Sequence, residues 1–219
     1  MADISKNIES IKNSIIEAAK RSNFNEEVKL VAVTKYQTDE AANEAIRCGI
    51  TDIGENHVQS LLRKENILLP CKKHFIGHLQ TNKVKQLLTI NDLVLIHSVD
   101  SLHLAKEIDR CAGRLNKNVD ILLQINVSGE ETKFGVPEAE AIQLLTEVSK
   151  LPNICVKGFM SIMPVITKSD YYKRMRYIYD NAAQIDKNIT ILSMGMSGDY
   201  ELAVENGSNL VRVGSLMFS

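Results

Sequence analysis

The chain has 219 residues, of which 44% are hydrophobic and 24% charged, and its 26 basic and 27 acidic side chains give a formal net charge of −1. This length fits one domain better than two small ones, and the composition is that of a soluble globular protein with a full core. Because no run of like charge reaches the length seen in polyanion-binding segments, we expect no nucleic-acid partner.

The sequence pattern also indicates neither a signal or membrane segment nor a disulfide framework. The first twenty residues are polar and periodic rather than apolar, and no apolar run approaches the ~20 residues that a membrane span requires. The four cysteines, Cys48, Cys71, Cys111 and Cys155, are scattered without CxxC spacing, which predicts free thiols rather than disulfides or a zinc site. We therefore expect a cytoplasmic protein with no membrane contact.

A leading amphipathic helix is predicted over residues 4–21, because Ile4, Ile8, Ile11, Ile15 and Ala18 fall on one face. Short apolar or β-branched runs then alternate with amphipathic stretches. The runs predict strands at residues 29–34, 51–54, 74–77, 93–97, 119–126, 156–160, 190–194 and 210–213. The stretches between them predict helices at residues 39–48, 56–64, 82–88, 101–115, 138–150, 170–186 and 200–206.

Eight strands alternating with helices are typical of an α/β fold, a (β/α)8 TIM-like barrel, although a doubly wound open sheet has the same alternation. Two observations favour the barrel: the sequence ends directly after the eighth run, and no GxGxxG follows the first. We expect one barrel domain over residues 1–219, with residues 1–22 as an extra N-terminal helix packed on it.

Lys35 follows the first predicted strand, and in a barrel the active site lies at the carboxyl ends of the strands. A lysine at the end of a buried strand would be partly desolvated, which lowers its pKa and makes its amine nucleophilic toward an aldehyde. A solvent-directed surface lysine is the simpler interpretation of this residue taken alone.

Two turns near the other end of the sequence predict an anion site. Small residues around Ser197 follow the seventh strand, and Gly214 and Ser215 follow the eighth. Small residues let backbone N–H groups approach an anion, and the loops after strands seven and eight of a barrel commonly bind phosphate. Asp199 is expected to cap the next helix, and two ordinary strand–helix turns are the alternative.

Arg212 lies between Val211 and Val213 in the last predicted strand, so it points to the opposite side of the sheet from both valines. In a barrel this side is either the interior or the outer face between helices. A buried guanidinium needs an acceptor, either a cofactor ring nitrogen or an acidic neighbour. The histidines give a weaker signal. His74 and His78 are four residues apart but flank a strand-like run, so no metal site is expected, and His97 has no acidic or cysteine cluster beside it in the sequence.

Long ordered motifs resemble the pyridoxal phosphate homeostasis protein family, whose members bind pyridoxal 5'-phosphate (PLP) and are related to the barrel domain of alanine racemase. The matching stretches are VAVTK at 31–35, IGENHVQ at 53–59, HFIGHLQTNK at 74–83, IHSVDS at 96–101, QINVSGEETKFG at 124–135, GFMSIMP at 158–164, LSMGMSGD at 192–199 and GSNLVRVGSLMF at 207–218.

The resemblance implies roles for eight residues toward the cofactor PLP. Lys35 is then the Schiff-base lysine, and Arg212 faces the pyridine nitrogen. The phosphate contacts implied are Ser197, Gly214 and Ser215, and the further pocket-wall positions are Asn56, Ser98 and Met194. Lys133 resembles a lysine near the site, without a catalytic role.

The resemblance implies a PLP carrier or buffer more than an enzyme, with no catalytic residue assigned. An arginine at the ring nitrogen leaves the ring neutral, so it stabilises carbanions less well than a carboxylate partner would. The expected partners are PLP and PLP-dependent apo-enzymes, and a monomer is expected. The alternatives are an amino-acid racemase of low activity, with Lys35 as one base, and a cofactor-free barrel.

Overall fold

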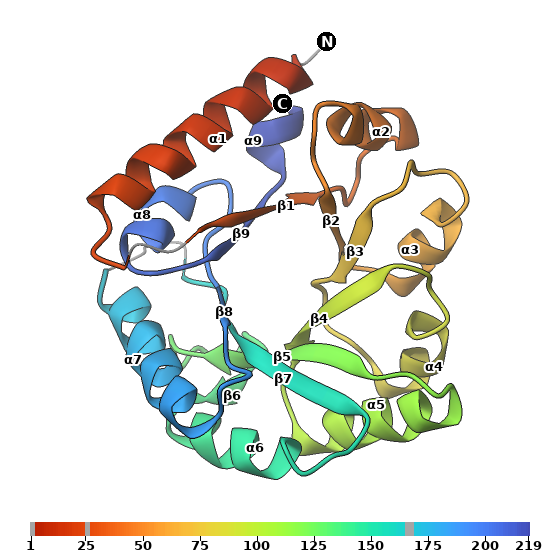
Figure 1. Cartoon of the computed structure of the whole chain (residues 1–219), viewed down its shortest axis with the longest axis vertical. Coiled ribbons are helices and arrows are strands. Elements are labelled where there is room, and N and C mark those ends of the chain that lie inside the picture. Colours follow the sequence, from red (N-terminus) through yellow and green to blue (C-terminus); the bar gives the residue numbers. More distant parts are fainter. Residues whose placement is uncertain (1–2, 25–26, 165–168) are drawn as a thin grey trace.

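A computed structural model of the chain describes residues 3–24, 27–164 and 169–219. Within these ranges, parallel strands pair in the order β4-β3-β2-β1-β9-β8-β7-β5, and β4 also pairs with β5, which closes the sheet into a barrel of eight strands. Helices surround this barrel (Figure 1). The expected barrel with its extra N-terminal helix is confirmed, and the open sheet is excluded because both of its edges are paired.

The strands of the barrel are β1 (Lys29–Val33), β2 (Asp52–Glu55), β3 (Lys72–Phe75), β4 (Leu93–Val99), β5 (Val119–Asn126), β7 (Ile154–Met160), β8 (Ile191–Ser193) and β9 (Leu210–Val213). The α-helices are α1 (Ile4–Arg21), α2 (Asp39–Arg47), α3 (Val58–Lys64), α4 (Val84–Leu87), α5 (Leu102–Arg114), α6 (Ala141–Val148), α7 (Ser169–Ile185), α8 (Tyr200–Glu205) and α9 (Ser215–Phe218). No helix in the described ranges is long and apolar enough to cross a membrane.

Helix α1 packs beside α8, α9 and α2 and buries the predicted face of isoleucines and Ala18. Its first turn is capped by Asp3, whose carboxylate accepts a hydrogen bond from the backbone N–H of Lys6 at 3.1 Å. The amide side chain of Asn7 donates to the carbonyl oxygens of Met217 and Ser219, so α1 also ties down the C-terminal segment. The two ends of the chain therefore meet on one side of the barrel (Figure 1).

The apolar core has two layers. A large outer cluster lies between the strands and the surrounding helices, and it includes Val211 and Val213. A small inner cluster fills part of the barrel with Val31, Leu95, Leu122, Met160 and Leu210. Other inward positions are polar and buried, among them Asp52, His74, His97 and Arg212.

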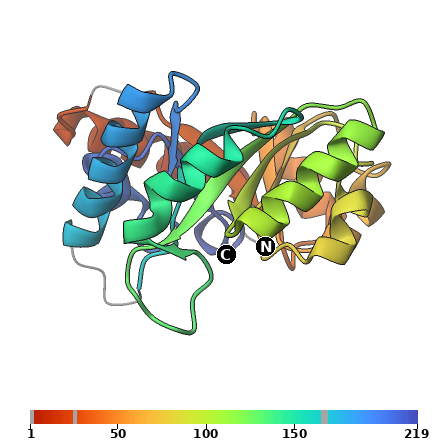
Figure 2. The same cartoon turned by 90° about the horizontal axis from the view of Figure 1, so that it is seen from below.

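Several boundaries differ from the sequence-based ones: β4 extends to Val99, β7 begins at Ile154, and the short helix α9 follows β9. Strand β3 lies two residues earlier than predicted, because the buried Lys73 satisfies its ammonium on the carbonyl oxygen of Asn91 at 3.0 Å and can occupy the strand. A two-residue strand, β6 (Val136–Pro137), pairs with the end of β5 after a loop that extends beyond the barrel in the side view (Figure 2). The predicted helices at 82–88 and 138–150 begin as 3-10 turns, η1 (Thr81–Lys83) and η2 (Glu138–Glu140).

Candidate functional site

Lys35 lies in a tight turn directly after β1. The carbonyl oxygen of Thr34 accepts a hydrogen bond from the N–H of Gln37 at 3.1 Å, which closes the turn around Lys35 and Tyr36. Tyr36 has a left-handed backbone, with φ of +66°, and a side chain that is 86% exposed. A non-glycine residue in this conformation costs about 1 kcal/mol or more, and such strain clusters at functional sites.

The expected desolvation of Lys35 is not observed, since the residue is exposed. The physical reason is its position: Thr34 is the last fully buried residue, and Lys35 already lies beyond the strand. Its ammonium instead lies 5.8 Å from the centre of the Tyr36 ring, within range of a weak cation–π contact. The Lys35 side chain is therefore accessible at the mouth of the barrel.

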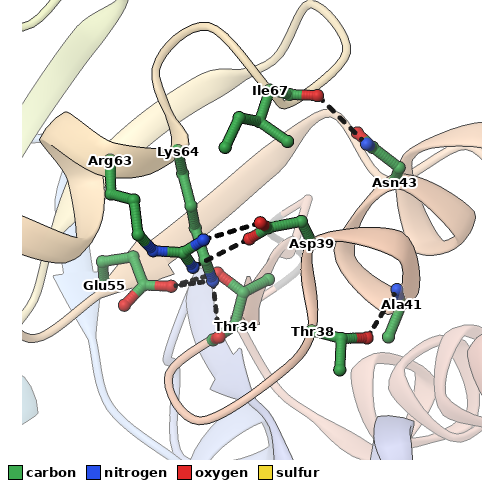
Figure 3. Close-up of polar contacts among 9 residues, drawn as sticks. All are labelled: Thr34, Thr38, Asp39, Ala41, Asn43, Glu55, Arg63, Lys64 and Ile67. Carbon is green, nitrogen blue, oxygen red and sulfur yellow. Dashed lines mark hydrogen bonds and ion pairs between the residues drawn. The ribbon is translucent and has the colours of Figure 1, made fainter.

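A buried ion pair contacts Thr34, the residue before Lys35 (Figure 3). The Lys64 ammonium donates to Glu55 Oε1 at 2.6 Å and to the Thr34 carbonyl oxygen at 2.9 Å. The Thr34 hydroxyl donates to the same Glu55 oxygen at 2.7 Å. The Lys64 and Glu55 side chains are only 3% and 1% exposed. The backbone immediately before Lys35 is therefore held by two charged side chains that sequence reasoning did not single out.

The turn after β8 brings Ser197 toward the neighbouring strand β9. Gly195 makes the turn possible: its φ is +90°, and a Cβ there would lie 2.7 Å from the Cβ of Ala203. Asp199 occupies the N-cap position of α8 but makes no cap hydrogen bond. Its carboxylate instead accepts from the N–H of Met196 at 2.6 Å and from the hydroxyl of Tyr172, so it stabilises the turn rather than capping the helix.

Backbone N–H groups converge on the Ser197 hydroxyl, as the predicted anion site requires. The N–H of Gly214 donates to Ser197 Oγ at 3.1 Å, and the N–H of Leu216 lies 3.4 Å from the same atom. Gly214 packs against β1, since a Cβ on it would lie 3.0 Å from the carbonyl oxygen of Val33. Ser215 is exposed at the start of α9, within the same turn. The sheet order β8-β9-β1 thus brings the predicted phosphate residues beside the Lys35 turn.

Arg212 points into the barrel, which settles the two orientations left open by the sequence. It is 4% exposed, its Nη1 donates to the Ser193 hydroxyl at 2.5 Å and its Nη2 donates to the Ser161 carbonyl oxygen at 3.0 Å. Burial lowers the pKa of Arg212 to about 10, opposed by the charge of Asp199, so the guanidinium is charged at neutral pH.

The three remaining residues differ in their surroundings. Asn56 Oδ1 and Ser98 Oγ are buried, and neither has a hydrogen-bond partner among the residues that the structure describes. Such orphaned buried acceptors are rare and call for an explanation. Asn56 also lines a pocket of about 350 Å³ at the carboxyl ends of β2 and β3. Met194 is fully buried and packs in the outer core cluster, so its side chain contributes to packing.

A buried pair of histidines was missed by sequence reasoning. His74 and His97 lie inside the barrel with a ring-nitrogen separation of 2.8 Å, and the other ring nitrogen of His74 lies 2.8 Å from Asp52 Oδ1. Burial lowers the pKa of both histidines, most strongly for His97. Within the described ranges, no cluster of three side chains could hold a metal ion. All three residues lie in predicted strands, but no local spacing in the sequence indicates that their side chains meet inside the barrel.

Comparisons with known proteins agree with this geometry. A family model described as alanine racemase, N-terminal domain, matches residues 5–219. The pyridoxal phosphate homeostasis protein of Aquifex aeolicus is 39% identical over 98% of this chain and 95% of its own length. The protein of the same name from Helicobacter pylori is 36% identical over 100% of this chain and 99% of its own length.

Solved structures give the same assignment. PipY of Synechococcus elongatus, in a structure described as having PLP bound, is 30% identical with a TM-score of 0.84 over 99% of this chain and 100% of that chain. An alanine racemase of Clostridium difficile shares the fold, with 16% identity and a TM-score of 0.75 over 97% of this chain and 59% of that one. The chain belongs to the pyridoxal phosphate homeostasis protein family, and it matches the alanine racemase N-terminal domain over almost its whole length.

Proposed function

We propose that this chain binds PLP as a Schiff base on Lys35 and acts in PLP homeostasis by holding the cofactor and passing it on. The observation that carries the proposal is the order β8-β9-β1 in the sheet, because Arg212 lies in β9 and Lys35, Ser197 and Gly214 lie in the turns that follow these three strands. A Schiff-base lysine, an anion site and a buried cation are the three groups that a phosphorylated pyridine aldehyde would engage.

The donors around Ser197 fit a phosphate group. The N–H groups of Gly214 and Leu216 point to one position, which the Ser197 oxygen fills in this structure. A rotation of the Ser197 side chain would free both donors for a phosphate oxygen, and the hydroxyl itself would add a third donor. The hydroxyl of Ser215, exposed in the same turn, is a fourth candidate.

The walls of the site fit a pyridine ring. Arg212 is a charged donor that supplies a hydrogen bond to the ring nitrogen while leaving that nitrogen unprotonated. The orphaned Asn56 Oδ1 and Ser98 Oγ are polar atoms free to contact polar groups of a ligand. Met194 is the weakest of the proposed contacts, because its side chain is buried in the outer core.

Release to a protein acceptor is supported by the rim of the site. Large apolar side chains are exposed on the segments that directly follow five strands, at the same mouth as Lys35. Tyr36, Phe134, Ile162 and Met196 lie in the loops after β1, β5, β7 and β8, and Leu216 lies in α9, after β9. Exposed apolar groups gathered on one face are typical of protein-contact surfaces. We therefore include PLP-dependent apo-enzymes among the proposed partners.

We also propose that the protein holds PLP without catalysing a reaction on it. The names of the full-length relatives describe homeostasis, whereas the racemases similar in fold are only about 16% identical. We further propose that residues 1–219 act as one domain and as a monomer in the cytoplasm. Analytical ultracentrifugation should give one species near the 24.5 kDa chain mass.

An absorbance titration tests the proposal. Addition of PLP to the purified protein should produce the visible band of a protein-bound Schiff base, and Lys35→Ala should abolish that band. Lys133→Ala is the matched control, because Lys133 lies in the loop after β5 and pairs with Glu130 at 2.9 Å. A band of equal size in Lys35→Ala would contradict the assignment.

A further inference from the structure

A continuous chain of buried polar groups crosses the inside of the barrel and ends on Arg212. Arg212 Nη1 donates to Ser193 Oγ, Ser193 Oγ lies 3.3 Å from His97 Nδ1, and His97 Nε2 lies 2.8 Å from His74 Nδ1. His74 Nε2 then lies 2.8 Å from Asp52 Oδ1. All five residues are at most 4% exposed. Five strands therefore contribute one residue each to a single path, in the order β9, β8, β4, β3 and β2.

The two ends of the path fix the direction of every hydrogen bond in it. Burial by itself raises the pKa of Asp52, but hydrogen bonds from His74 and Thr51 outweigh this and lower it to about 2, so Asp52 is a carboxylate that only accepts. Because His74 is held neutral by burial, its Nε2 carries the proton and its Nδ1 must accept from His97 Nε2–H.

The same logic continues to the other end. With the proton of neutral His97 on Nε2, its Nδ1 accepts from the Ser193 hydroxyl. The Ser193 oxygen is then left with its lone pairs toward Arg212, which can only donate. One carboxylate on β2 thus determines the orientation of a hydroxyl beside the guanidinium on β9.

The carboxylate end of the path lies away from the Lys35 mouth. Asp52 and His74 line a cavity of about 730 Å³ that is bounded by the amino-terminal ends of the strands, including Lys29 and Leu210. Lys29 also lies 3.8 Å from Asp52. Arg212, by contrast, is the second-last residue of β9, next to the Gly214 turn. The path therefore joins the two ends of the barrel.

We propose that Asp52, His74, His97 and Ser193 form a positioning chain that holds the Arg212 guanidinium in place for the cofactor ring. This inference rests on the proposed function, because it concerns the residue assigned to the ring nitrogen. The four residues touch no cofactor themselves; they act through Arg212. Without the Asp52 acceptor, the two imidazoles can exchange tautomers, and the Ser193 hydroxyl can turn its hydrogen toward Arg212, which weakens that contact.

The tautomers of the two histidines test the positioning chain separately from cofactor binding. In the protein without PLP, nitrogen-15 NMR of the histidine side chains should show the Nε2–H tautomer for both His74 and His97. Asp52→Leu should shift both rings toward a mixture of tautomers. Nδ1–H tautomers in the unmodified protein would overturn the proposal, whether or not the chain binds PLP.

A double-mutant cycle tests whether the positioning chain affects PLP binding through Arg212. Asp52→Leu should weaken PLP binding about tenfold, as expected for a misplaced hydrogen bond to a charged group, and should shift the visible band. In an Arg212→Met background the same change should have almost no further effect on affinity. Leu104→Val perturbs the outer core on α5, outside the barrel interior, and should leave affinity unchanged.

The outcomes separate the two proposals. If the unmodified protein fails to bind PLP, the proposed function fails, and the positioning role fails with it. If PLP binds but Asp52→Leu lowers affinity equally in both backgrounds, the positioning role alone is overturned. Asp52→Asn, which keeps an acceptor oxygen, serves if Asp52→Leu does not fold, and it should show a smaller change of the same kind.

Discussion

Removal of the Lys64 ammonium should be one of the most destabilising single changes in this protein. In Lys64→Met, Glu55 keeps only the Thr34 hydroxyl as a donor among the contacts described, and its carboxylate stays 1% exposed. Breaking a buried ion pair from one side costs about 3–5 kcal/mol, because the remaining charge is left uncompensated. For a chain of this size each kcal/mol shifts Tm by about 2–4 °C, so the expected loss is roughly 6–20 °C.

Urea unfolding followed by far-UV circular dichroism measures this effect, since the chain contains no tryptophan. Arg63→Met is the matched control: Arg63 is adjacent in sequence and pairs with Asp39, but its side chain is 56% exposed (Figure 3). An exposed pair contributes at most about 1 kcal/mol. Adding Glu55→Gln to Lys64→Met should recover stability. Equal losses for Lys64→Met and Arg63→Met would refute the reasoning.

Burial keeps the folded-state pKa of His74 and His97 below the ordinary 6.5, so the unfolded chain binds more protons and stability should fall as pH drops below 6.5. Urea unfolding at pH 7.5 and 5.5 checks this, and a His97→Gln variant with an undiminished pH slope would contradict it. Gly195→Ala should cost about 1–3 kcal/mol, because its φ is +90° and the new methyl would crowd Ala203; an unchanged Tm would oppose this. Ser197→Ala should weaken PLP binding about tenfold while leaving binding of unphosphorylated pyridoxal unchanged, and equal losses for both ligands would argue against a phosphate contact. Incubation of the PLP-loaded protein with L-alanine in D2O should give no deuterium at the α-carbon beyond that of free PLP, whereas exchange abolished by loss of the Schiff-base lysine would favour the racemase alternative.

Much of the fold could be predicted from the sequence because its barrel is regular. Apolar runs such as 119–126 are buried on both sides of a parallel sheet, so they stand out from the amphipathic helices between them. Alternation around Arg212 also predicted that Val211 and Val213 face the opposite side from the arginine, and the structure adds that the valines face the outer core. The start of β3 was hidden because the strand opens with two lysines, and burial of Lys73 depends on a carbonyl oxygen distant in sequence.

Most residues of the candidate site could be proposed because they follow strands, and Arg212 because it is a charged residue inside an apolar strand. Lys35, Ser197 and Gly214 lie in turns at one mouth of the barrel, and that position alone marked them for attention. The Lys64–Glu55 pair and the Asp52–His74–His97 path depend on contacts between different strands and helices. No local spacing encodes such contacts. A lysine on a helix and an isolated histidine in an apolar run look the same whether they are buried together or exposed.

The central claim is that Lys35, and no other lysine, carries the cofactor. Borohydride reduction of the PLP-loaded protein, followed by proteolysis and mass spectrometry of the peptides, tests it most directly. One phosphopyridoxyl group should be found, attached to the peptide that contains Lys35. Stoichiometric modification of another lysine, such as Lys64 or Lys133, with Lys35 unmodified would contradict it.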